Sequence, residues 1–158
     1  MSPVIRTNWL LTALILLLGI LAWQEHQTAS APQTVTSLDP ARVSRIRLWQ
    51  NEKLLAELVK QNDQWHWQPG DRPLEDGKWV NTLLHLAELP SLHRFPVEES
   101  RLQAFGLKPP RYRLELDDQV LDFGMPDPAS GLRYLRVGKT IHLITDSYTH
   151  ELARIPDA

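Results

Sequence analysis

The sequence contains no cysteine. This absence excludes disulfide-stapled scaffolds, zinc and iron–sulfur sites with thiolate ligands, thiol nucleophiles and acylation of a lipoprotein cysteine. Neither sign of charge is in large excess, because the sequence has 17 Lys and Arg and 19 Asp and Glu, for a net charge of −2. Proteins that bind nucleic acids display a strong basic excess, so we expect no nucleic-acid partner.

The 158 residues are enough for one ordinary globular domain plus an appendage. The appendage is an uncharged apolar run over residues 9–23, WLLTALILLLGILAW. As a helix this run spans roughly 22 Å, and its neighbours Asn8 and Gln24 bring it to the lower limit of about 17 residues for crossing a bilayer. Trp9 and Trp23 stand at its two ends, where indoles favour the headgroup region. The run therefore predicts a single transmembrane helix with Trp9 and Trp23 as its interfacial anchors.

The distribution of Lys and Arg predicts the orientation of this helix. Arg6 precedes it, whereas residues 24–41 carry no Lys or Arg before Arg42. The positive-inside rule then gives a cytoplasmic tail over residues 1–8 and places the rest of the chain outside the membrane. In a bacterium this means the inner membrane and the periplasm, and the inner membrane is the first expected partner.

A cleaved signal peptide is the alternative interpretation of the N-terminus. Arg6, a short apolar region and the small-residue site Ala29-Ser30-Ala31 fit that pattern. Cleavage after Ala31 would leave Pro32 next to the scissile bond, which disfavours signal peptidase. We expect the uncleaved anchor, and the sequence leaves cleavage open.

The remaining chain divides into a linker and one domain. Residues 24–37, QEHQTASAPQTVTS, are polar and small, which is typical of a flexible periplasmic stalk. Residues 38–158 then form the expected domain, and their number suits one hydrophobic core.

Hydrophobic patterning predicts an α+β domain of antiparallel strands with two or three short helices. Alternation puts Ile46 and Leu48 on one face of a strand, with Arg45, Arg47 and Trp49 on the other. The paired openings of residues 45–48 and 111–114 also allow two units, each of two or three strands followed by a helix. The expected strands are 44–49, 54–60, 65–67, 111–116, 120–123, 133–137 and 141–145, and the expected helices are 79–87, 97–105 with Gly106 as its cap, and 147–154.

Several short motifs occur in a familiar order. They include Leu38-Asp39-Pro40, 63–67 (DQWHW), 105–110 (FGLKPP), 133–137 (RYLRV) and 141–144 (IHLI). In this order the chain resembles the DUF4340 family, a domain of unknown function in bacterial membrane-anchored proteins, over about residues 37–155. Some members of that family are encoded beside ABC-type transport components, and many carry more than one copy of the domain. The resemblance implies an accessory role that is transport-related, and it brings no catalytic motif, activity or cofactor.

No reactive constellation stands out from the residues themselves. The six histidines lack the HExxH pattern and any i, i+4 pair, so we interpret them as surface or interface residues. Asp117-Asp118 is typical of a hairpin turn, and Glu98-Glu99 of the first turn of a helix. The serines lack a GxSxG setting. We therefore expect no enzyme, no metal and no cofactor.

Aromatic and arginine side chains are the remaining candidates for function. Trp65 and Trp67 share one face of a strand, where they either pack into the core or, if exposed, contact a partner or stack on a sugar ring. Arg111, Arg113 and Tyr134 complete the interface candidates, because Trp, Tyr and Arg are enriched in interface hot spots. The leading hypothesis is a membrane-anchored periplasmic accessory or scaffolding protein that contacts a membrane-protein partner. The alternative is a tethered periplasmic binding module for a glycan or small ligand.

Overall fold

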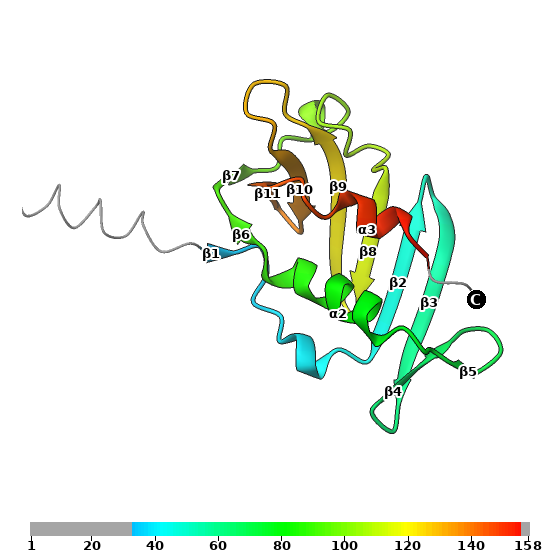
Figure 1. Cartoon of the computed structure of the whole chain (residues 1–158). Helices are drawn as coiled ribbons and strands as arrows, with labels where there is room; N and C mark the ends of the chain where they lie inside the picture. The colour runs from blue at the N-terminus through cyan, green and yellow to red at the C-terminus, as the bar shows by residue number, and fades with distance from the viewer. Residues whose placement is uncertain (1–32, 156–158) are drawn as a thin grey trace, which may run out of the picture. The chain divides into compact units, whose positions relative to one another are not determined.

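The computed structural model describes residues 33–155, and from Gln33 onward the chain forms one compact unit. Its centre is a nine-stranded antiparallel sheet in the order β5-β4-β3-β2-β8-β9-β10-β11-β7 (Figure 1). The strands are β1 Gln33–Thr34, β2 Arg45–Gln50, β3 Lys53–Gln61, β4 Gln64–Trp67, β5 Arg72–Pro73, β6 Pro90–Ser91, β7 His93–Pro96, β8 Tyr112–Leu116, β9 Gln119–Pro126, β10 Arg133–Val137 and β11 Thr140–Ile144. The helices are α2 Gly77–His85 and α3 Thr149–Ala153, with 3-10 turns at Pro40–Arg42, Leu86–Glu88 and Glu99–Arg101. The prediction of a small domain built mostly of antiparallel strands with few helices is confirmed.

The sheet consists of two four-stranded meanders that meet at its centre, with β7 added at the edge beside β11. Strands β2 to β5 lead into α2, and strands β8 to β11 lead into α3. At the junction Leu48 of β2 lies opposite Leu114 of β8. A half-turn about the midpoint of this pair exchanges Arg47 with Arg113, so the two similar sequence openings occupy equivalent places. This is the arrangement that two strand-then-helix units would produce.

One face of the sheet carries the main core. Ile46 and Leu48 of β2 are buried, as are Leu114 and Leu116 of β8, in agreement with the predicted alternation. Helices α2 and α3 lie on this side of the sheet (Figure 1). The opposite side of β2, β8 and β9 therefore faces away from both helices.

Helix α2 is fixed by its cap and by its aromatic contacts. Asp76 Oδ1 accepts the N–H groups of Lys78 and Trp79 at 3.1 and 3.3 Å, which satisfies two otherwise unpaired donors. The indole of Trp79 stacks on Trp67, with 6.0 Å between ring centroids. Its Nε1 also donates to the carbonyl of Glu151, so one side chain joins α2, β4 and α3.

The prediction of a helix over residues 97–105 is wrong. The structure has a 3-10 turn at Glu99–Arg101 followed by irregular turns, and Gly106 takes the expected left-handed conformation with φ +67°. Isolated helices of this length are marginal in water. Here the segment instead folds over the sheet and forms a second apolar cluster, made of Leu102, Phe105, Leu107 and Ile141.

The folded domain begins earlier than the expected boundary at Leu38. Strand β1 pairs with β6, the N–H of Val35 donates to the carbonyl of Leu89 at 2.9 Å, and Val35 is 4% exposed. Residues 33–37 are therefore part of the domain and not of a flexible stalk. The rest of the expected stalk, the expected span 9–23 with Trp9 and Trp23, and the expected tail 1–8 lie outside the described residues. Among residues 33–155, no helix is long and apolar enough to cross a membrane.

Candidate functional site

Trp65 and Trp67, the two tryptophans that the sequence suggested as interface candidates, pack against the core in the structure. Trp67 is 8% exposed and stacks on Trp79, and Trp65 is half-buried against the same core. The core interpretation of this pair is therefore the one that the structure supports. An exposed sugar-stacking platform made of Trp65 and Trp67 does not exist in the fold.

Tyr134 has a structural role in a loop. Its ring stacks on Phe105 at 4.4 Å between centroids, and its hydroxyl donates to Asp127 Oδ1 at 3.0 Å. Burial, followed by the bond to Asp127, raises the pKa of Tyr134. The pKa of Asp127 is lowered, first by the hydroxyl of Ser130. Tyr134 thus holds the loop after β9 and is not a free interface side chain.

Arg113 lies on the side of the sheet that faces away from α2 and α3. We call the part of this side formed by β2, β8 and β9 the open face, with Arg47 and Trp49 on β2, Arg113 and Glu115 on β8, and Asp122 on β9. Neighbouring strands bring these side chains into register, because Arg47 lies opposite Glu115, and Arg113 lies opposite both Trp49 and Asp122. Arg111 lies two residues before Arg113, is exposed, and stacks on Tyr112 with 5.7 Å from its guanidinium to the ring centroid.

Two ion pairs cross the open face. Arg113 donates two hydrogen bonds to Asp122, from Nε to Oδ1 at 2.6 Å and from Nη2 to Oδ2 at 3.2 Å. Asp122 is only 4% exposed, so the guanidinium neutralises a buried carboxylate. The bond to Asp122 is the main reason that the pKa of Arg113 is raised. In the second pair, Arg47 Nε lies 2.8 Å from Glu115 Oε2.

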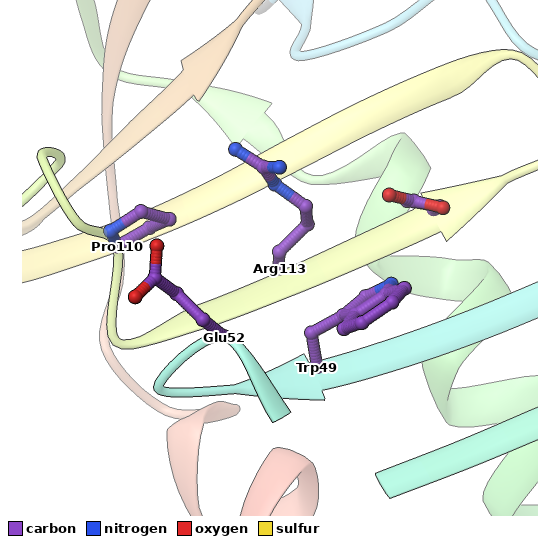
Figure 2. Close-up of a pocket in the computed structure, with 5 residues that line it drawn as sticks. Trp49, Glu52, Pro110 and Arg113 are labelled. Carbon is purple, nitrogen blue, oxygen red and sulfur yellow. The ribbon is translucent and has the colours of Figure 1, made fainter. Parts of the chain in front are cut away.

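A hollow of about 190 Å³ opens between these side chains. Figure 2 shows Glu52 and Pro110 on one side of it, Trp49 on the other and Arg113 between them, and Glu115 completes the lining. Two buried polar atoms of these lining residues, Trp49 Nε1 and Glu115 Oε2, have no hydrogen-bond partner among residues 33–155. The 2.8 Å contact of Arg47 with Glu115 is thus an ion pair that lacks hydrogen-bond geometry. A buried indole N–H without a hydrogen-bond acceptor is uncommon in folded proteins, which marks the hollow beside Trp49 as the candidate site.

Sequence reasoning found Arg113 but missed the rest of the hollow. The available signal was the alternation in β2, which places Trp49 on the polar side opposite Ile46 and Leu48. Glu52 lies in the turn that follows β2, whereas Pro110 comes from a loop that only the pairing of β2 with β8 brings to Trp49. That pairing joins residues far apart in the chain.

His142 corrects the expectation that the histidines are surface or interface residues, because it is buried within the domain. It is 5% exposed, and its Nδ1 lies 2.8 Å from Ser91 Oγ. Burial, followed by the charge of Arg94, lowers the pKa of His142. Within residues 33–155, no group of three or more His, Asp or Glu side chains could hold a metal ion.

Comparisons with known proteins add no relative. No family model, curated protein or solved structure matches the chain. The resemblance to the DUF4340 family therefore remains an expectation drawn from the motifs of the sequence.

Proposed function

We propose that this protein is a non-catalytic accessory subunit that is anchored in the inner membrane and docks a protein partner through the open face. The anchor and the periplasmic location come from the apolar run at residues 9–23 and the Lys/Arg bias around it. The anchor would supply location, and the domain would supply contacts. A transport-related partner follows from the resemblance to the DUF4340 family.

The observation that carries this proposal is the presence of Trp49 among arginines on a sheet face that no α-helix of the described domain covers. Trp and Arg are the residue types that most often dominate binding energy at protein interfaces. Trp49 is half-buried and its N–H is unpaired. Once the indole turns so that this covered N–H is accessible, an acceptor on a partner would satisfy the donor, which otherwise costs about 1–3 kcal/mol.

The charges of the open face favour a polar interface over a permanent apolar one. Arg47 and Glu115 form one pair, and Arg113 and Asp122 form the other, so the face presents both signs in alternation. Interfaces of this composition depend on complementary charges for orientation and specificity more than on burial of apolar area.

Arg113 is a poor probe of this interface, although the sequence suggests it. Reversing its charge would leave the buried carboxylate of Asp122 beside a second acid, so loss of binding would report misfolding. Trp49 and the exposed Arg111 are better choices, because neither neutralises a buried charge.

The experiment is co-purification of C-terminally tagged full-length protein from mild-detergent membranes, with mass spectrometry of what co-elutes. We expect a stoichiometric membrane protein with the wild type, and its loss with Trp49→Ala and Arg111→Glu. Lys78→Glu is the matched control, because Lys78 is exposed on α2, on the other side of the sheet. Recovery of the same partner with all three variants would contradict docking through the open face.

A further inference from the structure

We infer that the hollow at Trp49 binds one ring of a neutral saccharide. This inference does not depend on the protein partner, and it names a different ligand class. The proposed sugar-binding site is distinct from Trp65 and Trp67, which pack against the core and form no exposed platform for a sugar.

The size of the hollow limits its ligand to about one ring. Its volume is about 190 Å³, whereas pockets for drug-sized ligands start at roughly 300 Å³. A whole oligosaccharide would therefore extend out of the hollow across the sheet, with a single ring seated in it.

The lining offers each kind of contact that a sugar ring uses. Trp49 and Pro110 supply apolar surface for the C–H face of the ring. Glu52 and Glu115 supply carboxylate oxygens that accept hydrogen bonds from hydroxyls, and Arg113 supplies N–H donors. An apolar ligand would cover these polar groups without adding hydrogen bonds to them, which disfavours it.

The charge balance favours a neutral ligand. Arg113 is already paired with Asp122, and Glu115 is already paired with Arg47. A charged ligand would have to compete with these ion pairs, whereas a hydroxyl can add to them. Hydrogen bonds from hydroxyls to ionised groups are stronger than those between neutral groups.

The unpaired atoms point in the same direction. Trp49 Nε1 is a donor without an acceptor, and Glu115 Oε2 is an acceptor that has the ion pair with Arg47 but no hydrogen bond. A hydroxyl group can accept from the first and donate to the second. Both atoms are covered in this structure, so binding through the indole N–H requires Trp49 to turn, and that N–H then reports on binding.

The test uses the full-length chain in lipid nanodiscs prepared without sugar detergents, with isotope-labelled indole nitrogens. The probes are maltose, cellobiose and N,N′-diacetylchitobiose, each titrated to millimolar concentration, with saturation-transfer NMR on the sugar and the Trp49 indole signal on the protein. We expect saturable binding of at least one probe and a shift of the Trp49 signal. Trp49→Leu should weaken binding by roughly tenfold or more, equivalent to about 1.4 kcal/mol, and Glu52→Gln should weaken it several-fold.

Glu52→Gln keeps the test decisive if Trp49→Leu folds poorly, because Glu52 is exposed in a turn. Glu75→Gln is its matched control, since Glu75 is an exposed acid beside the start of α2, outside the hollow. Absence of binding by all three probes, or binding that Trp49→Leu and Glu52→Gln leave unchanged, would overturn the inference. Either result leaves the co-purification experiment unaffected, so the two proposals fail separately.

Discussion

Arg113 and Asp122 lie opposite each other on β8 and β9, and the guanidinium Nε is 2.6 Å from Oδ1 of a carboxylate that is almost fully buried. The pair lies on the face that we propose for binding, yet Arg113 also stabilises the fold because it neutralises the buried carboxylate of Asp122. This relationship separates the residues of the open face that hold the sheet together from those that are free to bind.

We predict that Arg113→Met destabilises the domain by about 2–3 kcal/mol. Removing one partner of a fully buried ion pair costs about 3–5 kcal/mol. The side chain of Arg113 is 42% exposed, so water reaches the site and reduces the cost. Urea unfolding of the full-length chain, followed by circular dichroism, measures the change.

Arg111→Gln is the control for that measurement, because Arg111 has no buried counter-charge and should change stability by less than about 0.5 kcal/mol. Equal effects of the two substitutions would contradict the structural role given to the Arg113–Asp122 pair.

Trp67→Ala should destabilise the domain much more than Trp49→Ala. Trp67 fills the core against Trp79, so its truncation should cost about 3–5 kcal/mol of unfolding free energy. Trp49→Ala removes an unpaired buried N–H on the open face, which offsets part of the lost packing and leaves a cost of about 1 kcal/mol or less. Thermal unfolding of the two variants distinguishes them, and a larger loss for Trp49→Ala would show that Trp49 is the core residue.

Glu52→Gly should stabilise the hairpin between β2 and β3 by about 1 kcal/mol. Asn51 and Glu52 form a two-residue turn with φ of 47° and 65°, and the second position of such turns favours glycine. Asn51→Gly is the comparison, with a smaller gain because asparagine tolerates this conformation. If Glu52→Gly lowers the unfolding midpoint, the side chain of Glu52 contributes to the fold and not only to the hollow.

His142 should make stability depend on pH on the acid side of neutrality. Burial lowers its pKa from 6.5 in the folded state, so the unfolded chain binds this proton more readily than the folded chain. Stability is therefore complete above pH 6.5 and falls as the pH decreases toward the folded pKa.

His142→Gln should remove this slope between neutral pH and the folded pKa, whatever its effect at pH 7. Urea midpoints measured across that range are the test. The lowered pKa of Asp127 acts in a separate window, below 3.8, and does not interfere. An unchanged slope in His142→Gln would show that another group titrates.

The sequence predicted the parts of the fold that depend on local pattern. Alternation in β2 and β8 identified the buried positions Ile46 and Leu114, and the spacing after Trp79 identified α2. The register of β2 against β8 could not be predicted in this way, because it depends on the contact of two distant segments. The helix expected over 97–105 failed for the same reason, since packing onto Ile141 overrode the local preference.

The tryptophans show this limit most clearly. Trp65 and Trp67 lie on the same face of a short strand, and the sequence of that strand does not indicate whether this face meets the core. The answer comes from β3, where Leu58 lies opposite Trp67, and from α2, where Trp79 stacks on it. Trp49 stands opposite to Leu48 in the alternation of β2, yet the hollow beside it needs Glu52, Pro110 and β8 as well.

Site-specific photo-crosslinking in intact cells tests the central claim most directly. A photoreactive residue in place of the exposed Arg111, which follows Pro110 of the hollow, samples the surroundings of the hollow, and one in place of the exposed Lys78 samples the helix side. We predict a discrete adduct with one membrane protein from position 111 and none from position 78. An adduct from position 78 alone would contradict docking through the open face and would move the interface to the helices.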